Sequence, residues 1–136
     1  MTPRGIRNNN PLNIRHSSDV FQGETKGIDK SFKTFESMLY GYRAAFVTLA
    51  TYLSKGHNTI EKIVAKWAPP TENNTNGYIE KVEKWSGVPK NQILTASDGV
   101  YYILIVAAMS AVENGRTANI LDIQNGFNQQ TKITIQ

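Results

Sequence analysis

Apolar residues recur at steps of three and four over most of the chain beyond residue 37, and this spacing is typical of amphipathic helices. The first such segment places these apolar side chains on one helical face: Leu39, Tyr42, Phe46, Leu49, Ala50 and Leu53. The pattern predicts helices over residues 37–56, 58–68, 73–87, 98–114 and 118–127.

The ends of these helices are marked by residues that cap helices well. Ser, Thr, Asn and Asp accept hydrogen bonds from N–H groups of a first turn, and glycine adopts the left-handed conformation that ends many helices. The expected N-caps are Ser37, Asn58 or Thr59, and Ser97 or Asp98; the expected stops are Gly56, Pro69–Pro70, Gly87 and Gly115. Segment 98–114 is apolar nearly all round, which predicts a central helix. Trp67 and Trp85 fit apolar helix faces and are expected in the core.

The first 36 residues lack a sustained period. They combine Gly, Asn and Ser with isolated apolar side chains, which predicts an irregular lobe with short strand pieces between residues 19 and 35. Residues 128–136 form a polar tail. The whole pattern predicts one mainly α-helical domain over residues 1–136, with an irregular lobe at 1–36, a helical lobe at 37–127 and a buried axial helix near its C-terminal end.

Composition narrows the classes of function. The net charge of +4 and a pI near 9.4 favour anionic partners. The basic residues are dispersed, however, without the clusters of nucleic-acid-binding segments, so no nucleic-acid partner is expected. No apolar run reaches the roughly 18 residues of a membrane span, and no secretory signal is visible. The absence of cysteine excludes disulfides and thiolate chemistry.

Motifs of several enzyme classes are also missing. His16 and His57 lie far apart and outside any HExxH spacing, so no metal site is expected. There is no GxSxG elbow, and no Walker or dinucleotide-binding glycine pattern, so neither acyl-transfer chemistry nor a nucleotide cofactor is expected. Carboxylate chemistry remains as the candidate.

Glu113 occupies the most unusual position of any acidic residue in the chain. It follows the apolar run YYILIVAAMSAV directly, at the C-terminal end of the predicted central helix. Desolvation and the negative end of the helix dipole both favour the protonated carboxyl and raise its pKa. A glutamic acid that stays protonated near neutral pH suits the general acid of a glycosidase. The alternative is that Glu113 belongs to the solvated last turn of its helix.

The stretch RGIRNNNPLNIR, residues 4–15, concentrates amide side chains near the start of the chain. Polysaccharides present hydroxyl and N-acetyl groups, which amides can pair with as donors and acceptors. Such amides either line a sugar-binding groove or build the turn ahead of Pro11 through local hydrogen bonds to the backbone.

Several of these stretches resemble parts of lysozyme-like enzymes. VAAMSAVENG resembles the helix that delivers the catalytic Glu, NNNPLNIR followed by FQG resembles the NN-F-G-I-K segment of glucosaminidases, and KWAPPTENNTNGYIEKV resembles their RYA-TD-x-Y segment. The Glu helix comes first in those enzymes and last here, which implies a circularly permuted lysozyme-like fold of the α+β lysozyme type. The order of motifs over residues 4–120 resembles a family of phage virion-associated or secreted peptidoglycan-degrading domains with an RGIRNNNPxNIR signature.

The resemblance implies which side chains would line a cleft around Glu113. The substrate-binding residues it suggests are Asn9, Asn10, Asn13, Phe21, Gln22, Glu72 and Tyr78. Tyr78 would hydrogen-bond the substrate or Glu113, and Glu72 would either bind substrate or hold its loop. Two positions depart from the family: Phe21 stands where tryptophan is usual, and Val112 where a polar residue is usual.

A second catalytic carboxylate is assigned first to Asp29, in the family-matching stretch IDKSFKTF, with Glu24 as the runner-up. Such a group would orient a water molecule or stabilise an oxocarbenium-like state opposite Glu113. Either residue is alternatively a plain surface acid.

The expected function is therefore cleavage of the peptidoglycan glycan strand, by hydrolysis or by lytic transglycosylation, with Glu113 as general acid. The expected partner is the bacterial cell wall, reached without a classical signal. The chain is expected to be a monomer or part of a virion or secretion assembly. The alternative is a non-catalytic virion or wall-binding protein that keeps the same fold.

Overall fold

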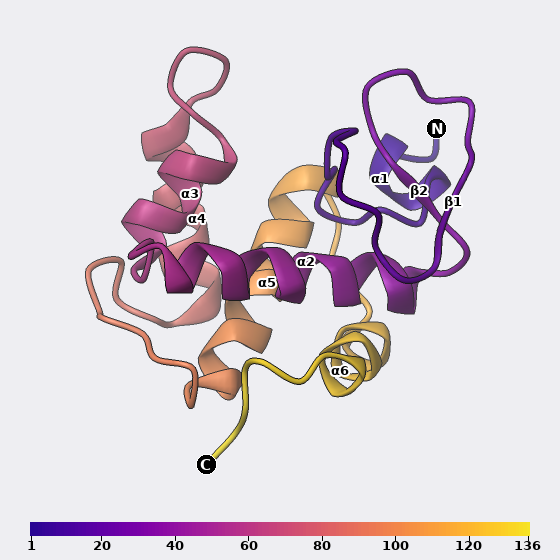
Figure 1. Ribbon diagram of the computed structural model, residues 1–136. Helices are drawn as coiled ribbons and strands as arrows, with labels where there is room; N and C mark the ends of the chain where they lie inside the picture. The colour runs from indigo at the N-terminus through magenta and orange to yellow at the C-terminus, as the bar shows by residue number, and fades with distance from the viewer.

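The computed structural model describes residues 1–136 and consists mainly of helices, with one small sheet (Figure 1). The elements in chain order are α1 (Arg4–Arg7), β1 (Glu24–Thr25), β2 (Thr34–Phe35), α2 (Met38–Ser54), α3 (Ile60–Trp67), α4 (Thr75–Ser86), α5 (Gly99–Asn114) and α6 (Ile120–Gln129). The five predicted helices are all present, each within three residues of its predicted ends. The expectation of a mainly helical chain is confirmed. None of the helices is both long and apolar enough to span a bilayer.

Local capping explains most of the helix ends. The Thr59 hydroxyl accepts a hydrogen bond from the Lys62 N–H, and Gly87 and Gly115 end α4 and α5 in the left-handed conformation. The other two predicted N-caps, Ser37 and Asp98, stand at the predicted positions, but neither side chain makes a capping hydrogen bond. Ser37 precedes α2 in an extended conformation without a side-chain cap. The Asp98 carboxylate turns away from α5 and accepts hydrogen bonds from Thr95 instead.

The core lies between helices α2 to α6, and α2 and α6 cross in close contact (Figure 1). A methyl group on Gly126 of α6 would lie 2.8 Å from the Arg43 nitrogen and 2.9 Å from the Leu39 carbonyl oxygen, both in α2. Only glycine therefore permits this approach of the two backbones. The largest fully buried apolar side chains of the helical part include Tyr42, Phe46, Leu49, Tyr102, Ile105 and Met109.

Helix α5 lies centrally but is not enclosed along its whole length. Residues 105–110 are mostly buried, whereas Val100, Tyr101 and Leu104 near its start expose apolar surface. Roughly half or more of the accessible surface of a folded protein is contributed by apolar atoms, so exposed side chains on an apolar helix are ordinary. Trp85 in α4 is also 51% exposed, which corrects its expected place in the core.

The N-terminal lobe is irregular, as predicted, and contains the two short strands in the expected region. Glu24 pairs with Phe35 and Thr25 with Thr34 in antiparallel register. Lys33 is almost completely buried, and its ammonium group forms a 3.0 Å ion pair with Glu24. Helix α1 was not predicted because a single turn carries no measurable period.

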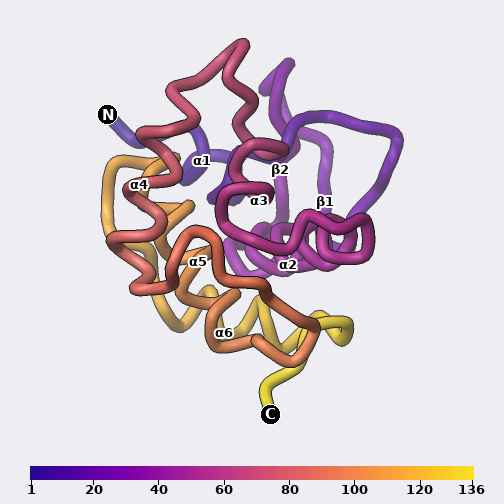
Figure 2. The backbone as a smooth tube through the Cα atoms, turned by 90° about the vertical axis from the view of Figure 1, so that its left-hand side faces the viewer, coloured from indigo at the N-terminus to yellow at the C-terminus, as the bar shows by residue number.

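The last residues do not form a free polar tail. The Gln130 side chain donates to the Ile133 carbonyl and accepts from its N–H, and Ile133 is buried. The Thr134 backbone then bonds Ala96 and Gly99 at the start of α5. This docking could not be predicted from the polar composition of residues 128–136, because only the buried Ile133 and the side-chain hydrogen bonds of Gln130 hold the segment in place. Figure 2 shows the C-terminal segment passing beneath the helices, away from the N-terminal lobe.

Candidate functional site

Glu113, Asn13 and Tyr78 converge from three separate parts of the chain. Glu113 ends α5, Tyr78 lies in the first turn of α4, and Asn13 lies in the loop after α1. The Asn13 Nδ2 donates to Oε1 of Glu113 at 2.8 Å, and the Tyr78 hydroxyl donates to Oε2 at 2.9 Å. Both carboxylate oxygens of Glu113 therefore face neutral donors.

The surroundings of Glu113 shift its titration toward the protonated form. Burial raises the pKa of Glu113, and the hydrogen bonds from Asn13 and Tyr78 and the charge of Arg15 only partly oppose this effect. Burial beside this carboxyl also raises the pKa of Tyr78 well above its usual range, so its phenol stays neutral. The site thus combines a carboxyl that favours its proton with two neutral partners.

The turn that carries Asn13 is built by another asparagine. Asn10 is 0% exposed, and its Nδ2 donates to the carbonyls of Ile14 and Lys33 at 2.9 Å, while its Oδ1 accepts from the Ile14 N–H. Asn13 itself adopts a left-handed conformation with φ 54°, which asparagine tolerates better than most residues. These bonds fix the direction in which the Asn13 amide points.

Contacts from the helices hold this turn from the other side. Asn114 donates to the carbonyl oxygen of Pro11 at 2.8 Å, and the indole N–H of Trp67 donates to that of Leu12 at 3.1 Å. Gly5 of α1 packs so closely against Asn114 that a methyl group there would overlap its amide oxygen. The loop, α3 and the end of α5 are thereby locked together at the site.

A polar hollow of about 340 Å³ lies beside Asn13. The residues that matter to its chemistry are Asn13, Arg15, Tyr52, Lys66, Trp67 and Glu72. The Arg15 guanidinium lies 3.7 Å from the Glu72 carboxylate, and both side chains are mostly exposed. Arg15 therefore links Glu72 to the electrostatic environment of Glu113.

The structure does not bring Asp29 into this arrangement. One Asp29 oxygen accepts hydrogen bonds from the Ser31 and Phe32 N–H groups, and the other faces Asn8 and Arg4. The hydrogen bond from the Ser31 N–H, which has the largest effect, and the one from the Asn8 amide lower the pKa of Asp29 to about 2. Asp29 organises its own loop. Glu24, the other candidate for a second carboxylate, is paired with Lys33.

Four more of the predicted cleft residues have structural partners or lie apart. Asn10 is fully buried in its turn, so it cannot face a substrate groove in this fold. Asn9 donates to the Phe35 carbonyl at 3.1 Å. Phe21 packs against Phe35 with ring centroids 6.4 Å apart, and Gln22 is exposed in the adjoining turn.

Three residues that support the arrangement around Glu113 were not predicted from the sequence as site residues. Arg15, Trp67 and Asn114 act through charge or through bonds to loop carbonyls. Arg15 and Asn114 do fall inside the quoted motifs, and that was the only signal available for them. Trp67 was expected in the core, and its indole N–H contact could not be read from helical spacing.

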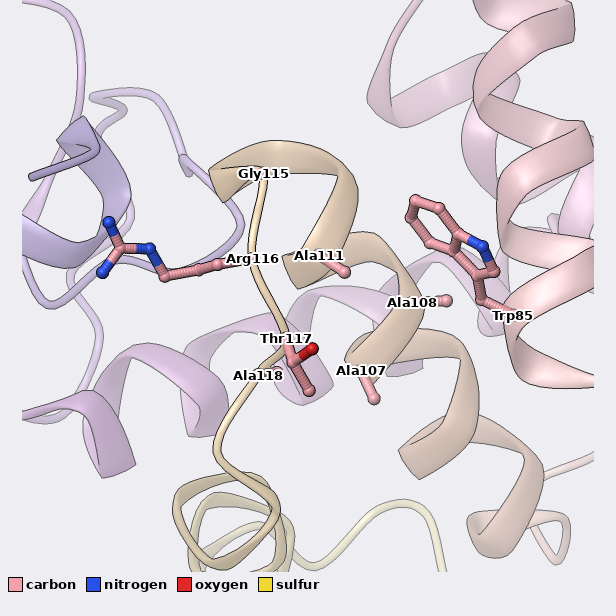
Figure 3. Close-up of a pocket in the computed structure, with 8 residues that line it drawn as sticks. All are labelled: Trp85, Ala107, Ala108, Ala111, Gly115, Arg116, Thr117 and Ala118. Atoms are coloured by element: carbon pink, nitrogen blue, oxygen red, sulfur yellow. The ribbon is translucent and has the colours of Figure 1, made fainter.

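A second, apolar hollow of about 500 Å³ lies between α4, α5 and residues 115–118 (Figure 3). Trp85 projects from α4 toward Ala107 and Ala108, and Arg116 extends away on the far side of the loop. Glu113 is not among its lining residues. No group of three or more His, Asp or Glu side chains lies close enough together to hold a metal ion.

The chain is similar in sequence to a phage protein. No established protein-family profile matches the chain. Over 130 residues it is 41% identical to Protein P5 of Pseudoalteromonas phage PM2, and the match covers 91% of this chain and 79% of that protein.

Proposed function

The chain belongs to the family of Protein P5 of Pseudoalteromonas phage PM2. From the chemistry of its candidate site we propose that it is a glycosidase that cleaves the glycan strand of bacterial peptidoglycan. The observation that carries the proposal is the carboxyl of Glu113, which is partly buried, has a raised pKa and is held by Asn13 and Tyr78. A carboxyl of this kind suits proton donation to a glycosidic oxygen.

The two partners of Glu113 indicate which oxygen carries the catalytic proton. The Asn13 Nδ2 can only donate, so the oxygen facing it, Oε1, remains an acceptor. The Tyr78 hydroxyl can rotate to accept a hydrogen bond as well as donate one. The proton therefore resides on Oε2, next to Tyr78, and from there it passes to the leaving-group oxygen of the substrate.

The hollow beside Asn13 suits a glycan strand. It presents amide, hydroxyl, ammonium and aromatic groups from Asn13, Thr48, Lys66 and Trp67. Sugar rings carry hydroxyl and N-acetyl groups that pair with such polar side chains and apolar faces that rest on aromatic rings. We assign the substrate-binding groove to this hollow, which shares Asn13 with the catalytic carboxyl.

Glu72 replaces Asp29 as the second carboxylate in this proposal. Its side chain is exposed at the groove, and its one ion pair, with Arg15, is long. It is free to orient a water molecule or to stabilise developing positive charge on the sugar. The oxygens of Asp29 are already occupied by Ser31, Phe32 and Asn8.

The arrangement supports a lysozyme-like fold with a permuted order of elements. The apolar helix α5 carries a glutamate at its end, where the helical part meets the small sheet-containing lobe in which the chain begins (Figure 1). We propose delivery by a phage particle or a secretion assembly, because a relative is a phage protein.

The decisive experiment measures release of soluble fragments from purified peptidoglycan by the native protein and by Glu113→Gln. The glutamine keeps both contacts, since its oxygen accepts from Asn13 and its amide donates to Tyr78, but it supplies no proton. Glu80→Gln, an exposed change in α4, is the matched control and should retain activity. Mass spectrometry of the fragments separates hydrolysis from lytic transglycosylation by the presence or absence of anhydro ends.

A non-catalytic wall-binding or virion protein is the rival function. It predicts that the native protein sediments with peptidoglycan at every pH tested but releases no fragments. Equal fragment release by the native protein and Glu113→Gln would instead remove Glu113 from the mechanism.

A further inference from the structure

A second polar hollow, of about 560 Å³, lies on the N-terminal lobe between α1 and the loop of residues 27–34. Only one of its nine lining residues is hydrophobic. Its lining includes Arg4, Arg7, Ile28, Lys30, Ser31 and Thr34. None of them belongs to the hollow beside Asn13, so the two sites are separate.

Donor groups dominate this hollow. The side chains of Arg7 and Lys30 are exposed and form no hydrogen bond or ion pair within the protein. The hydroxyls of Ser31 and Thr34 are also without protein partners. The three cations, Arg4, Arg7 and Lys30, face a single carboxylate, so the lining carries a net charge of 3 − 1 = +2.

The one carboxylate in the hollow is already satisfied. Asp29 accepts from two backbone N–H groups and from Asn8, and its ion pair holds Arg4 at 3.3 Å. The Arg4 guanidinium is further positioned 5.0 Å from the centroid of the Phe32 ring. Asp29 thus fixes Arg4 in place and leaves Arg7 and Lys30 uncompensated.

We propose that this hollow binds a phosphate group. Phosphate offers several oxyanion acceptors in a tetrahedral arrangement, which suits arginine, lysine and hydroxyl donors approaching from different elements. Here α1 supplies Arg7, while the loop supplies Lys30 and the two hydroxyls. A neutral sugar would leave the two cations unpaired, so the ligand class differs from that of the groove beside Asn13.

The phosphate has two possible sources, a lipid headgroup or a water-soluble phosphate compound. Ile28 is 101% exposed at the rim of the hollow, between Lys26 and Lys30. An apolar tip flanked by cations suits contact with an anionic bilayer surface. The Ile28 side chain has no hydrogen-bond donor to offer a soluble phosphate, so its substitution distinguishes the sources.

The first test is a titration of the isotope-labelled protein with inorganic phosphate, followed by the NMR shifts of residues 27–34. The double variant Arg7→Gln/Lys30→Gln should bind phosphate at least about tenfold more weakly than the native protein. Lys81→Gln/Lys84→Gln in α4 removes the same charge from another surface and should change affinity less than about twofold. Equal weakening by the two double variants, or shifts spread over the whole surface, would overturn the site.

The second test compares vesicles of phosphatidylcholine alone with vesicles that also contain phosphatidylglycerol. Binding to the latter that falls in Ile28→Ser, with unchanged affinity for inorganic phosphate, assigns the phosphate to a lipid. Phosphate binding without vesicle binding assigns it to a soluble compound, and binding of neither probe overturns the proposal. Glu113→Gln should bind phosphate like the native protein, so this test is independent of the proposed catalysis.

Discussion

The hydroxyl of Tyr78 lies 2.9 Å from Oε2 of Glu113, across 35 positions of sequence. The hydrogen bond joins the first turn of α4 to the last turn of α5, at the point where the two helices meet the N-terminal loop. It favours the carboxylate form, while burial of Glu113 favours the acid. Together with the Asn13 hydrogen bond and the charge of Arg15, these two influences set the pH at which the carboxyl can give up a proton.

Tyr78→Phe should therefore change the pH profile as well as the rate. Loss of the hydroxyl removes an interaction that lowers the pKa of Glu113, so the pKa rises further. Activity that needs the protonated acid is lost as the pH rises through this pKa, and the alkaline limb moves to higher pH. Turnover at the optimum should fall by about tenfold, because the proton loses its acceptor. A lower rate with an unmoved alkaline limb would contradict this role.

Asn13→Gly should reduce activity by about tenfold or more without preventing folding. Glycine keeps the left-handed backbone at φ 54° but removes the amide that bonds Glu113. Asn9→Gly is the matched control, since Asn9 has φ 52° but its amide bonds the Phe35 carbonyl. That control should lose about 1 kcal/mol of stability and keep its turnover. Fragment release and thermal unfolding measure the two effects, and equal losses of turnover would refute the distinction.

Glu113→Gln should unfold at a higher temperature than the native protein at neutral pH. Burial raises the folded-state pKa of Glu113 above its unfolded value, so ionisation costs stability as the pH rises from about 4.5 through the folded pKa. Glutamine does not ionise and avoids that cost. The difference should vanish below the unfolded pKa, where both proteins are neutral at this position. Calorimetry from pH 4 to pH 8 measures the difference between the two unfolding temperatures. A difference that grows as the pH falls would contradict the prediction.

Asp29→Asn tests whether this carboxylate organises a loop or takes part in chemistry. Its folded-state pKa of about 2 lies below the usual 3.8, so its contribution to stability is present above pH 3.8 and is lost as the pH falls through 2. The variant should unfold at a lower temperature than the native protein at pH 7, and the gap should close in acid. Turnover per folded molecule should remain within about threefold. Loss of turnover in a fully folded variant would instead indicate that Asp29 takes part in catalysis.

Glu72→Gln should show the opposite pattern. Its carboxylate is exposed and its 3.7 Å pair with Arg15 is a surface contact, so stability should change by less than about 1 kcal/mol. Fragment release should fall by about tenfold to a thousandfold if Glu72 orients water or stabilises charge on the sugar. Full activity would leave Glu113 as the only carboxylate of the mechanism and would favour lytic transglycosylation.

The helices could be predicted from the sequence because their apolar spacing and their glycine ends are local properties. The position of Trp85 could not, since spacing identifies an apolar face but not whether a neighbouring helix covers it. Helix α5 shows the same limit at Val100, which lies on an apolar helix yet is exposed. Strand positions in the N-terminal lobe were predicted only as a region.

The site could be predicted in part for similar reasons. Glu113 could be identified because it follows a long apolar run, and the packing of such a helix removes water from the carboxyl at its end. Asn10 and Asn13 have the same side chain in the same motif. Only the conformation of the turn makes Asn10 a buried residue that bonds the backbone and Asn13 a partner of Glu113. The choice between Asp29 and Glu72 depended on which loop lies near Arg15, and no local pattern encodes that distance.

The Asn13–Glu113 contact spans 100 positions, so it exists only while the N-terminal loop stays docked on the end of α5. Detaching that loop would leave α2 to α6 largely intact, because their mutual packing supplies most of the core. Partial opening would therefore abolish turnover while far-UV circular dichroism hardly changed. On heating, activity should therefore be lost before helicity. The loss of activity then measures the opening of the interface between the N-terminal lobe and the helical lobe.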